Sequence, residues 1–472
     1  MTDAPDDTED LKRLGYVQEL ARGMGGFSSF ALSFSIISIL TGAVVLYGHG
    51  LKYGGPFVMT VGWPFVTLMT LTVAASLAEL ASAYPTAGAL YHWAALLGGR
   101  RAGYFTAWLN TVGQFAITAG IDYGLAEFLA PMLKLKTDRP HVLALCAVIL
   151  LSHAILNHVG VRVVARLSTV SAWVHLVGVA LFVGALLAYA PKRDVAFLFQ
   201  KTTVANSYGL GFALALLQAQ WTFTGYDASA HATEETVDPR NNAPRGILMS
   251  VVVSGIAGWL LLLALTAAIQ GDPRVVAATD NPFITVVHDA LGARGDRLIW
   301  VAMAAMWFCG LASVTSNSRM LYAFARDGGT PFSAQIAKVS PRFSSPHVAV
   351  WVSAAAALVV AAWAQALAAM TALSTIALYA SYALPIVYAF FARREGRLST
   401  GPFTLGRWSS MVNGIAIAWV AIVTVLFVLP PNVLAGYGFL AALVLITLMW
   451  VLWAKQRFPG PKVTAERSSS AS

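Results

Sequence analysis

Side chains that could do chemistry gather in one stretch, QAQWTFTGYDASAHATEETVDPRNNAPRG, which occupies residues 218–246. The stretch continues an apolar segment and then meets Gly225, Asp227 and His231. An ionised carboxylate at bilayer depth costs roughly 2.5 kcal/mol or more, so such residues usually belong to a site or a pathway. The neighbouring glycine favours an interrupted helix, and interrupted helices at membrane depth line cavities. The sequence therefore predicts half of a solute-binding site here.

Residue patterns typical of enzymes are missing from the sequence. It contains no His-Glu-x-x-His run, no Gly-x-Ser-x-Gly run and no Walker-type phosphate loop. Cys146 and Cys309 lie in apolar segments and are interpreted as small hydrophobic side chains. His153 and His158 are interpreted as a pair at the membrane interface rather than as metal ligands. We predict that the protein is not an enzyme and needs no cofactor or metal.

The composition indicates what kind of chain must position these residues. The 472 residues are 57% hydrophobic and 11% charged, whereas a soluble domain carries roughly 25% charged residues. This composition predicts an all-α polytopic membrane protein, and it argues against a nucleic-acid-binding function for the net charge of +9. Apolar segments of about 20 residues, the length that spans a bilayer, lie near 26–48, 57–83, 102–131, 140–158, 164–190, 209–236, 245–270, 297–325, 347–365, 368–391, 410–430 and 433–454.

The loops between these twelve expected spans indicate the orientation. A cytoplasmic N-terminus assigns about two thirds of the 31 Lys and Arg residues to the inside, as the positive-inside rule requires. We therefore expect a multi-pass protein of the plasma (inner) membrane with both termini in the cytoplasm. Two further apolar segments, 87–97 and 281–291, are interpreted as short helices that do not span the bilayer.

The first and sixth expected spans share an unusual feature. Gly42 interrupts the first span and Gly225 the sixth, and paired interrupted segments indicate an inverted-repeat transporter. In that design the ends of half-helices direct backbone N–H groups at a substrate carboxylate. The alternative is that both glycines only permit close helix packing.

Four motifs resemble those of a known family. They are LGYVQELARGMGGFSSFALSFSIISILTG, AELASAYPTAGALYHW, GYDASAHATEETVDPRNNAPRGI and SVTSNSRMLYAFARDGGTP. Together they resemble the amino acid–polyamine–organocation superfamily, and most closely its amino acid/choline transporter branch, which includes GABA and choline permeases. The resemblance implies a leucine-transporter-like fold of five plus five helices in inverted repeats, followed by two more. The implied divisions are a cytoplasmic tail (1–22), the first repeat (23–200), the second repeat (201–395), the last two helices (396–456) and a second cytoplasmic tail (457–472).

The resemblance also implies where the substrate binds. Residues 39–43 match the unwound part of the first helix and residues 223–227 match the break in the sixth, while Phe223 would cover the site. Asp227 has two readings, a contact to a cationic substrate or a cap on the second half-helix. Asp122 on the third span is expected to take a substrate ammonium or a proton, or to bond to a Ser or Tyr. The expected substrate-binding residues are Ile39, Leu40, Thr41, Gly42, Ala43, Asp122, Phe223, Thr224, Gly225, Tyr226 and Asp227.

Carboxylates near the inner ends of helices are interpreted as a gate. Glu234 and Glu235 are expected to pair with Arg240, Arg245 or basic residues of other inner loops, and Glu79 has the same interpretation.

Two coupling ions fit the resemblance. A sodium site would use hydroxyl groups of the eighth helix, here Ser313, Thr315 and Ser316, because sodium prefers hard oxygen ligands. In proton-coupled members a lysine takes its place, and that position falls on His175, which titrates near neutral pH. The alternative for His175 is a neutral side chain hydrogen-bonded between helices. Proton coupling is the favoured reading, while sodium coupling and uncoupled exchange stay open.

The expected function is import of an amino acid or related amine by alternating access, with a zwitterionic amino acid or GABA as the favoured substrate. The alternatives are an organic-cation permease for choline, ethanolamine or polyamines, and a nutrient sensor without transport. The expected partners are this small molecule and the lipid bilayer; the oligomeric state is open.

Overall fold

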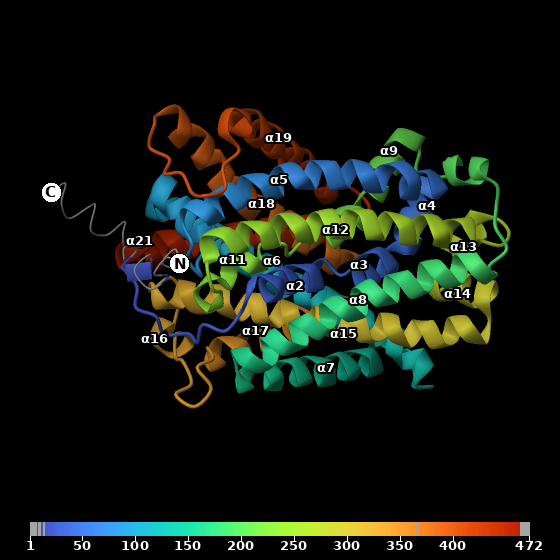
Figure 1. Cartoon of the computed structure of the whole chain (residues 1–472), viewed down its shortest axis with the longest axis horizontal. Coiled ribbons are helices and arrows are strands. Elements are labelled where there is room, and N and C mark those ends of the chain that lie inside the picture. The colour runs from blue at the N-terminus through green and yellow to red at the C-terminus, as the bar shows by residue number, and fades with distance from the viewer. Residues whose placement is uncertain (1–6, 8–10, 13–14, 365–366, 463–472) are drawn as a thin grey trace, which may run out of the picture.

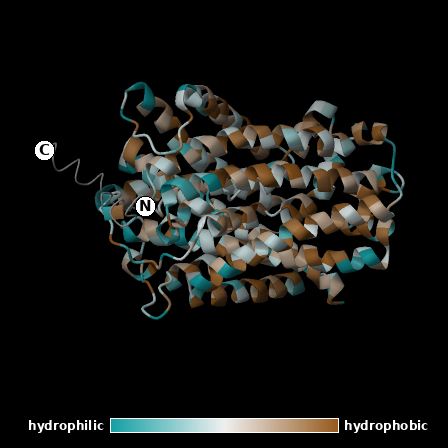
Figure 2. Cartoon of the chain, viewed as in Figure 1, coloured by the Kyte–Doolittle hydropathy of each residue, from teal (hydrophilic) through white to brown (hydrophobic). Residues whose placement is uncertain are grey.

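The computed structural model describes residues 7, 11–12, 15–364 and 367–462. Within these residues the regular structure is helical, and β-pairing is limited to one isolated parallel bridge between Met24 and Thr236. Figure 1 shows the long helices α5, α8, α12 and α15 along the length of the molecule, with α13 and α14 at one end and α16 and α21 at the other. Hydrophilic residues gather toward these two ends and hydrophobic residues cover the middle (Figure 2). This distribution matches helices that cross a bilayer.

The elements in chain order are α2 (Gly26–Ile37), α3 (Ile39–Val45), α4 (Tyr47–Phe57), η1 (Val58–Gly62), α5 (Trp63–Ala83), α6 (Leu90–Met132), α7 (Arg139–Val159), α8 (Val161–Tyr189), η2 (Val195–Phe199), α9 (Tyr208–Ala215), α10 (Leu217–Thr222), α11 (Ala228–His231), η3 (Thr233–Glu235), α12 (Pro239–Ala267), α13 (Pro273–Ala277), α14 (Pro282–Leu291), α15 (Ala293–Arg326), α16 (Ser333–Ile336), α17 (His347–Trp363), α18 (Leu367–Arg394), η4 (Gly406–Trp408), α19 (Ser409–Val428), α20 (Val433–Met449), η5 (Trp450–Ala454) and α21 (Lys455–Arg457).

Nine helical stretches in the described part of the chain are long and apolar enough to cross a membrane. Three of the twelve expected spans are not among them. The third lies inside the 43-residue α6, where polar residues recur along the helix. The sixth is divided into α9, α10 and α11, and the ninth is α17, which has only 17 residues. The structure thus has a polytopic helical architecture, and the count of twelve stays a prediction.

The two short apolar segments are helical for local reasons. Gly99 has non-helical backbone angles (φ 84°, ψ 169°), so α6 kinks there and its first residues, from Leu90, form a separate short helix. The side chain of Asn281 accepts a hydrogen bond from the N–H of Ile284 at 3.1 Å, and Pro282 follows it as the first residue of α14. An Asn cap followed by proline is a favourable helix start.

Helices from the two halves of the chain pack against one another. The long α6 packs against α15, α17 and α18, while α2 packs between α12 and α8. The short α3 contacts α10, so the interrupted parts of the first and sixth spans meet inside the bundle.

Candidate functional site

The first helix break lies at Ser38. Its backbone is left-handed (φ 33°, ψ 87°), and it separates α2 from α3. The carbonyl of Ser38 accepts hydrogen bonds from the N–H groups of Thr41 and Gly42, at 2.8 and 2.9 Å. These bonds begin α3, so residues 39–43 are helical and the prediction that they are unwound is wrong. The break comes one residue earlier than expected because Ser38 itself takes the non-helical conformation.

The second break lies where the sequence predicts it. Phe223–Asp227 separate α10 from α11, and Gly225 has a φ of 81°. A Cβ atom on Gly225 would lie 2.2 Å from Cγ2 of Ile36, so both the backbone angle and the close approach require glycine. Tyr379 donates to the carbonyl of Phe223 at 2.5 Å, and the N–H of Gly225 donates to the hydroxyl of Tyr382 at 3.2 Å. Two tyrosines of α18 therefore bond to backbone groups of the break that have no helical partner.

The two breaks face each other closely. A Cβ atom on Gly42 would lie 2.4 Å from Oγ1 of Thr222, and Gln218 donates to the carbonyl of Ala43 at 2.9 Å. A cavity of about 10 Å³ remains between them, lined by Ile36, Ile37, Thr41, Gly42, Ile117, Trp221 and Thr222. This volume is enough for about one water molecule. The described conformation therefore holds the two breaks together, and an amino acid needs them to separate.

Asp227 is buried and its carboxylate is occupied by neighbouring side chains. It accepts hydrogen bonds from Tyr382 at 2.8 Å and Asn110 at 3.3 Å, and it contacts Nε2 of His231 at 3.0 Å. Asp227 stands at the cap position of α11, yet its side chain accepts no bond from the described α11 backbone. The capping interpretation is therefore wrong, because donors from α18, α6 and α11 itself hold the carboxylate instead. Phe223 packs on Trp63, with ring centroids 4.9 Å apart.

Asp122 on α6 pairs with a histidine rather than with a Ser or Tyr. Its Oδ2 lies 3.2 Å from Nδ1 of His153 on α7, and both side chains are fully buried. His158 lies one turn further along α7 and accepts a hydrogen bond from Trp351 at 3.2 Å. The interpretation of His153 and His158 as an interfacial pair is therefore wrong. Four residues separate them, yet His153 turns to the interior and His158 to α17.

His175 on α8 reaches the first break directly. Its Nε2 lies 2.6 Å from Oγ of Ser38, and its Nδ1 lies 2.8 Å from the carbonyl of Ser171. Because a carbonyl only accepts, Nδ1 carries the proton, and Nε2 then accepts from the Ser38 hydroxyl. The neutral imidazole satisfies both contacts.

The three α15 residues considered for sodium are already bonded to two different helices, Ser313 and Ser316 to α6 and Thr315 to α7. Ser313 bonds to Thr118 of α6 at 2.7 Å, and Thr315 donates to Asn157 of α7 at 2.7 Å. Ser316 accepts from Gln114 of α6 at 3.4 Å. The α15 side chain that reaches the first break is Cys309, whose thiol donates to the carbonyl of Ile36 at 3.3 Å.

The predicted gate carboxylates pair with arginines of α15. Glu235 contacts Arg319 at 3.2 Å with both side chains fully buried, and Glu234 contacts Arg326 at 2.8 Å. Arg240 instead donates to the carbonyl of Ser82 at 3.2 Å. Arg245 is exposed, and among the described residues no ion pair joins it to either glutamate. The expected pairing with Arg240 or Arg245 is therefore wrong, and the alternative of basic residues from other segments is confirmed, because Arg319 and Arg326 of α15 reach η3.

Glu79 forms a separate contact on the same end of the bundle. It lies 2.7 Å from Arg393 of α18 and accepts hydrogen bonds from Thr404, Leu405 and Ser409. It thus holds the connection between α18 and α19 rather than the segment around η3.

Similarity to known proteins decides the family. A family model described as "Amino acid permease" matches residues 24–452. This chain belongs to the amino acid permease family. It is 37% identical to "Amino-acid permease BAT1" of Arabidopsis thaliana, over 96% of this chain and 95% of that protein. It is 38% identical to the Oryza sativa homolog of that permease. It is 29% identical to the "GABA-specific permease" of Saccharomyces cerevisiae, in an alignment that covers 90% of this chain and 78% of the yeast protein. The superfamily resemblance is confirmed, and the protein is a multi-pass membrane permease rather than an enzyme.

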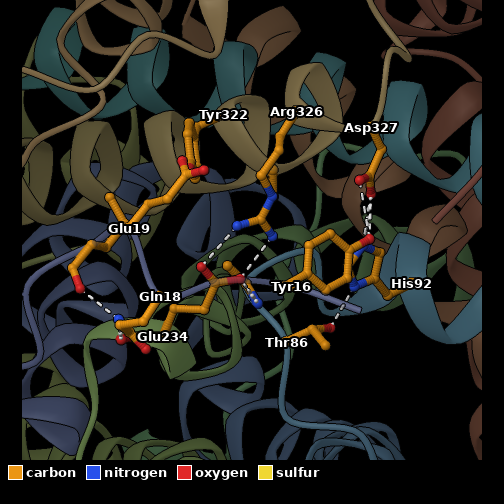
Figure 3. A network of polar contacts seen from close by, with 12 residues as sticks. Tyr16, Gln18, Glu19, Thr86, His92, Glu234, Tyr322, Arg326 and Asp327 are labelled. Carbon is orange, nitrogen blue, oxygen red and sulfur yellow. Dashed lines mark hydrogen bonds and ion pairs between the residues drawn. The ribbon is translucent and has the colours of Figure 1, made fainter. Parts of the chain in front are cut away.

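The permease also has a polar network that the sequence did not reveal (Figure 3). Asp327, directly after α15, accepts hydrogen bonds from Tyr16 at 2.8 Å and from Tyr91 at 2.5 Å, and contacts Nε2 of His92 at 2.9 Å. Burial, reinforced by the Asp327 carboxylate, raises the pKa of Tyr16 well above its ordinary value. The guanidinium of Arg326 lies 4.3 Å from the Tyr16 ring centroid. The segment before α2 is thereby fastened to the end of α15.

The same N-terminal segment of the permease is bonded to η3. Gln18 donates to the carbonyl of Glu234 at 2.8 Å, and the N–H groups of Gly23 and Met24 donate to the carbonyl of Glu235 at 3.0 and 2.9 Å. Figure 3 shows Gln18, Glu234 and Arg326 beside the Tyr16 group. Three parts of the chain, the start of α2, η3 and the end of α15, are therefore joined on one side of the two breaks. The motifs LGYVQELARG and ARDGGTP carry these residues, but their contact depends on the fold.

Proposed function

We propose that this permease imports a zwitterionic amino acid by alternating access, in symport with protons. The observation that carries the proposal is the pair of facing helix breaks at Ser38 and Phe223–Asp227. Backbone N–H and C=O groups at a break are free of helical partners and can bind the two charged ends of an amino acid. The names of the relatives, two amino-acid permeases and a GABA-specific permease, support an amino acid as substrate.

The proposed architecture is a leucine-transporter-like fold with twelve spans. The first repeat would occupy 23–200, the second 201–395, and the last two helices 396–456. The positions of the two breaks in the first and sixth apolar segments support this division. We place the permease in the plasma (inner) membrane with cytoplasmic termini, on the distribution of Lys and Arg between the loops.

The substrate carboxylate is proposed to bind at the first break and the ammonium group at the second. The start of α3 offers N–H groups to the carboxylate, next to the hydroxyl of Thr41 and the unsubstituted Gly42. Carbonyls of the second break would accept from the ammonium group, with Trp221 limiting the size of the side chain. Asp227 is already held by three side chains, which favours a zwitterion over a bare organic cation.

Proton coupling is supported by histidines in the interior of the bundle. His153 contacts Asp122 and His231 contacts Asp227, whereas His175 at the first break is satisfied in its neutral form. Histidine titrates in the physiological range and carries protons in membrane proteins. Sodium would need converging oxygen ligands, whereas the hydroxyls of Ser313 and Thr315 bond to α6 and α7. No cofactor is part of the proposal.

Counterflow in proteoliposomes tests the function. Liposomes that contain the purified permease are loaded with an unlabelled compound. The same compound in labelled form is then added outside, and amino acids, GABA, choline and a polyamine are compared at set pH and sodium concentrations. We expect counterflow of zwitterionic amino acids, and stimulation of net uptake by an inward proton gradient without sodium. Responses confined to choline or polyamines, or to sodium gradients, would overturn the substrate class or the coupling ion.

Two glycine variants make the test specific to the breaks. Gly42→Ala places a methyl group 2.4 Å from Oγ1 of Thr222 and is expected to abolish counterflow. Gly414→Ala on α19 has no atom within 4 Å of its new methyl group and is expected to retain it. Equal activity in both variants would contradict a binding site between the breaks.

A further inference from the structure

Asp122 and His153 form a buried pair with unused bonding capacity. Oδ2 of Asp122 lies 3.2 Å from Nδ1 of His153, and both side chains are 0% exposed. Oδ1 of Asp122 and Nε2 of His153 have no hydrogen-bond partner among the described residues. Buried polar atoms are nearly always bonded, so two orphans on one pair need an explanation.

The charge of the pair depends on a single proton. The pair is neutral overall when it holds one proton more than a carboxylate and a neutral imidazole do. This form is either a carboxylate with an imidazolium or a carboxylic acid with an imidazole. Without that proton the pair carries one negative charge in the bilayer interior, where an isolated charge is strongly unfavourable. The closed bundle therefore favours the protonated pair.

The surroundings do not supply a compensating charge. The titratable groups near Asp122 are the thiols of Cys146 on α7 and Cys309 on α15, both neutral in a buried setting. Arg319 of α15 is paired with Glu235. Arg319 donates to Asn157 at 3.4 Å, one helical turn from His153, but it is already paired.

The pair is also mechanically linked to the first helix break. Oδ1 of Asp122 lies 2.0 Å from the position that a Cβ atom on Gly310 would take, so α15 packs directly on the carboxylate. The preceding residue, Cys309, donates to the carbonyl of Ile36 in the last turn of α2. A change in the charge or hydration of Asp122 thus acts on α15 at the point where α15 holds the break.

We propose that Asp122 and His153 form the proton-binding site of this permease and that they carry the coupling proton. The coupling role rests on the proposed function. In the cycle, the pair takes one proton from water while the bundle is open on the outer side, and only the neutral pair is buried when the breaks close. Opening on the other side hydrates the pair, and the proton leaves to the cytoplasm. His175 needs no such proton, because its neutral form satisfies both ring nitrogens.

The test compares Asp122→Asn and His153→Gln with two controls on α7. Asp138→Asn changes the exposed carboxylate at the start of α7, where Asn caps a helix as well as Asp does, and His158→Gln changes the histidine one turn from His153. All are reconstituted in full-length form, and uptake of the amino acid with the strongest counterflow is measured against external pH. We expect Asp122→Asn and His153→Gln to lose at least tenfold in gradient-driven accumulation, with residual uptake that no longer changes with pH. The controls should keep the original pH profile.

Infrared difference spectroscopy on purified protein reads the proton without transport. Between high and low pH, the permease should show a protonated-carboxyl band or an imidazolium band that Asp122→Asn and His153→Gln remove or shift and Asp138→Asn does not. If Asp122→Asn fails to fold, His153→Gln decides, because glutamine keeps a donor for Oδ2 but holds no titratable proton.

Three outcomes separate the proposals. An unchanged infrared difference in both variants would overturn the proton site, whatever the transport result. Proton-driven accumulation that survives in both variants would overturn its coupling role. Absence of any amino-acid counterflow in the unaltered permease would overturn the proposed function and the coupling role, while the infrared result would still decide the proton site.

Discussion

Removal of Arg319 should open the side of the bundle that the N-terminal segment closes. Arg319 and Glu235 approach to 3.2 Å and are both 0% exposed, so they form a buried ion pair between α15 and η3. Removing one partner of such a pair costs about 3–5 kcal/mol, because the other charge stays buried and uncompensated. If that cost applies to the closed conformation alone, a loss of about 3 kcal/mol shifts the closed-to-open ratio by about a hundredfold.

The two native cysteines provide the assay. In a Cys146→Ala background the single thiol is Cys309, which is buried beside the carbonyl of Ile36 at the first break. Its reaction rate with a water-soluble thiol reagent follows the population of the open conformation. Arg319→Met should raise this rate up to about a hundredfold. Asp272→Asn, which breaks the exposed pair with Arg274, should leave it unchanged.

A double-mutant cycle separates the ion pair from general damage. Arg319→Met combined with Glu235→Gln removes both charges, so the double variant should be closer to the parent than the sum of the single effects by at least about 1 kcal/mol. Labelling within twofold of the parent in Arg319→Met, or strict additivity in the cycle, would refute the view that this pair holds the closed conformation.

Three further perturbations have defined outcomes. Gly225→Ala forces a non-glycine residue to φ 81°, which costs about 1–2 kcal/mol in addition to the steric clash. Transport should therefore be lost, and the melting temperature should fall. Uptake at the level of the unaltered permease would contradict this. Tyr382→Phe removes a 2.8 Å hydrogen bond to a buried carboxylate, and stability should fall by about 1–3 kcal/mol while Tyr388→Phe on the same helix has little effect, as thermal shifts would reveal. The pKa of Tyr16 is higher in the folded than in the unfolded chain, so the stabilising contribution of Tyr16 is complete below about pH 10 and is lost as the pH rises above this value. Tyr16→Phe should therefore reduce the fall in melting temperature at alkaline pH. An unchanged slope of melting temperature against pH would refute this.

Part of the fold and of the site can be predicted from local sequence, because the residues that determine it act on their own segment of the backbone. Gly225 interrupts its helix since only glycine fits the backbone angle and the contact there, and Asn281–Pro282 begins α14 through its own cap. Ser38 offers no such signal, since serine is also tolerated inside helices. Its side chain contacts His175, which lies 137 positions later and could not be paired with it from the sequence.

The partners of the buried charges could not be read from the sequence for the same reason. Asp122 and His153 are 31 residues apart and on different helices, and nothing in their local patterns specifies which faces meet. Arg240 and Arg245 were expected to pair with the predicted gate glutamates because they are close to them in the sequence. The packing of α15 against η3 brings Arg319 and Arg326 there instead.

The narrow space between the two breaks also bears on the energy economy of the cell. A cavity of about 10 Å³ holds a single water molecule and not a file of them, and protons cross membranes rapidly along such files. A permease resting in this conformation therefore preserves the electrochemical gradient on which the proposed symport depends. Substitutions that widen the contact between Gly42 and Thr222 would impose a metabolic burden through passive leak, even where the affinity for the solute is unchanged.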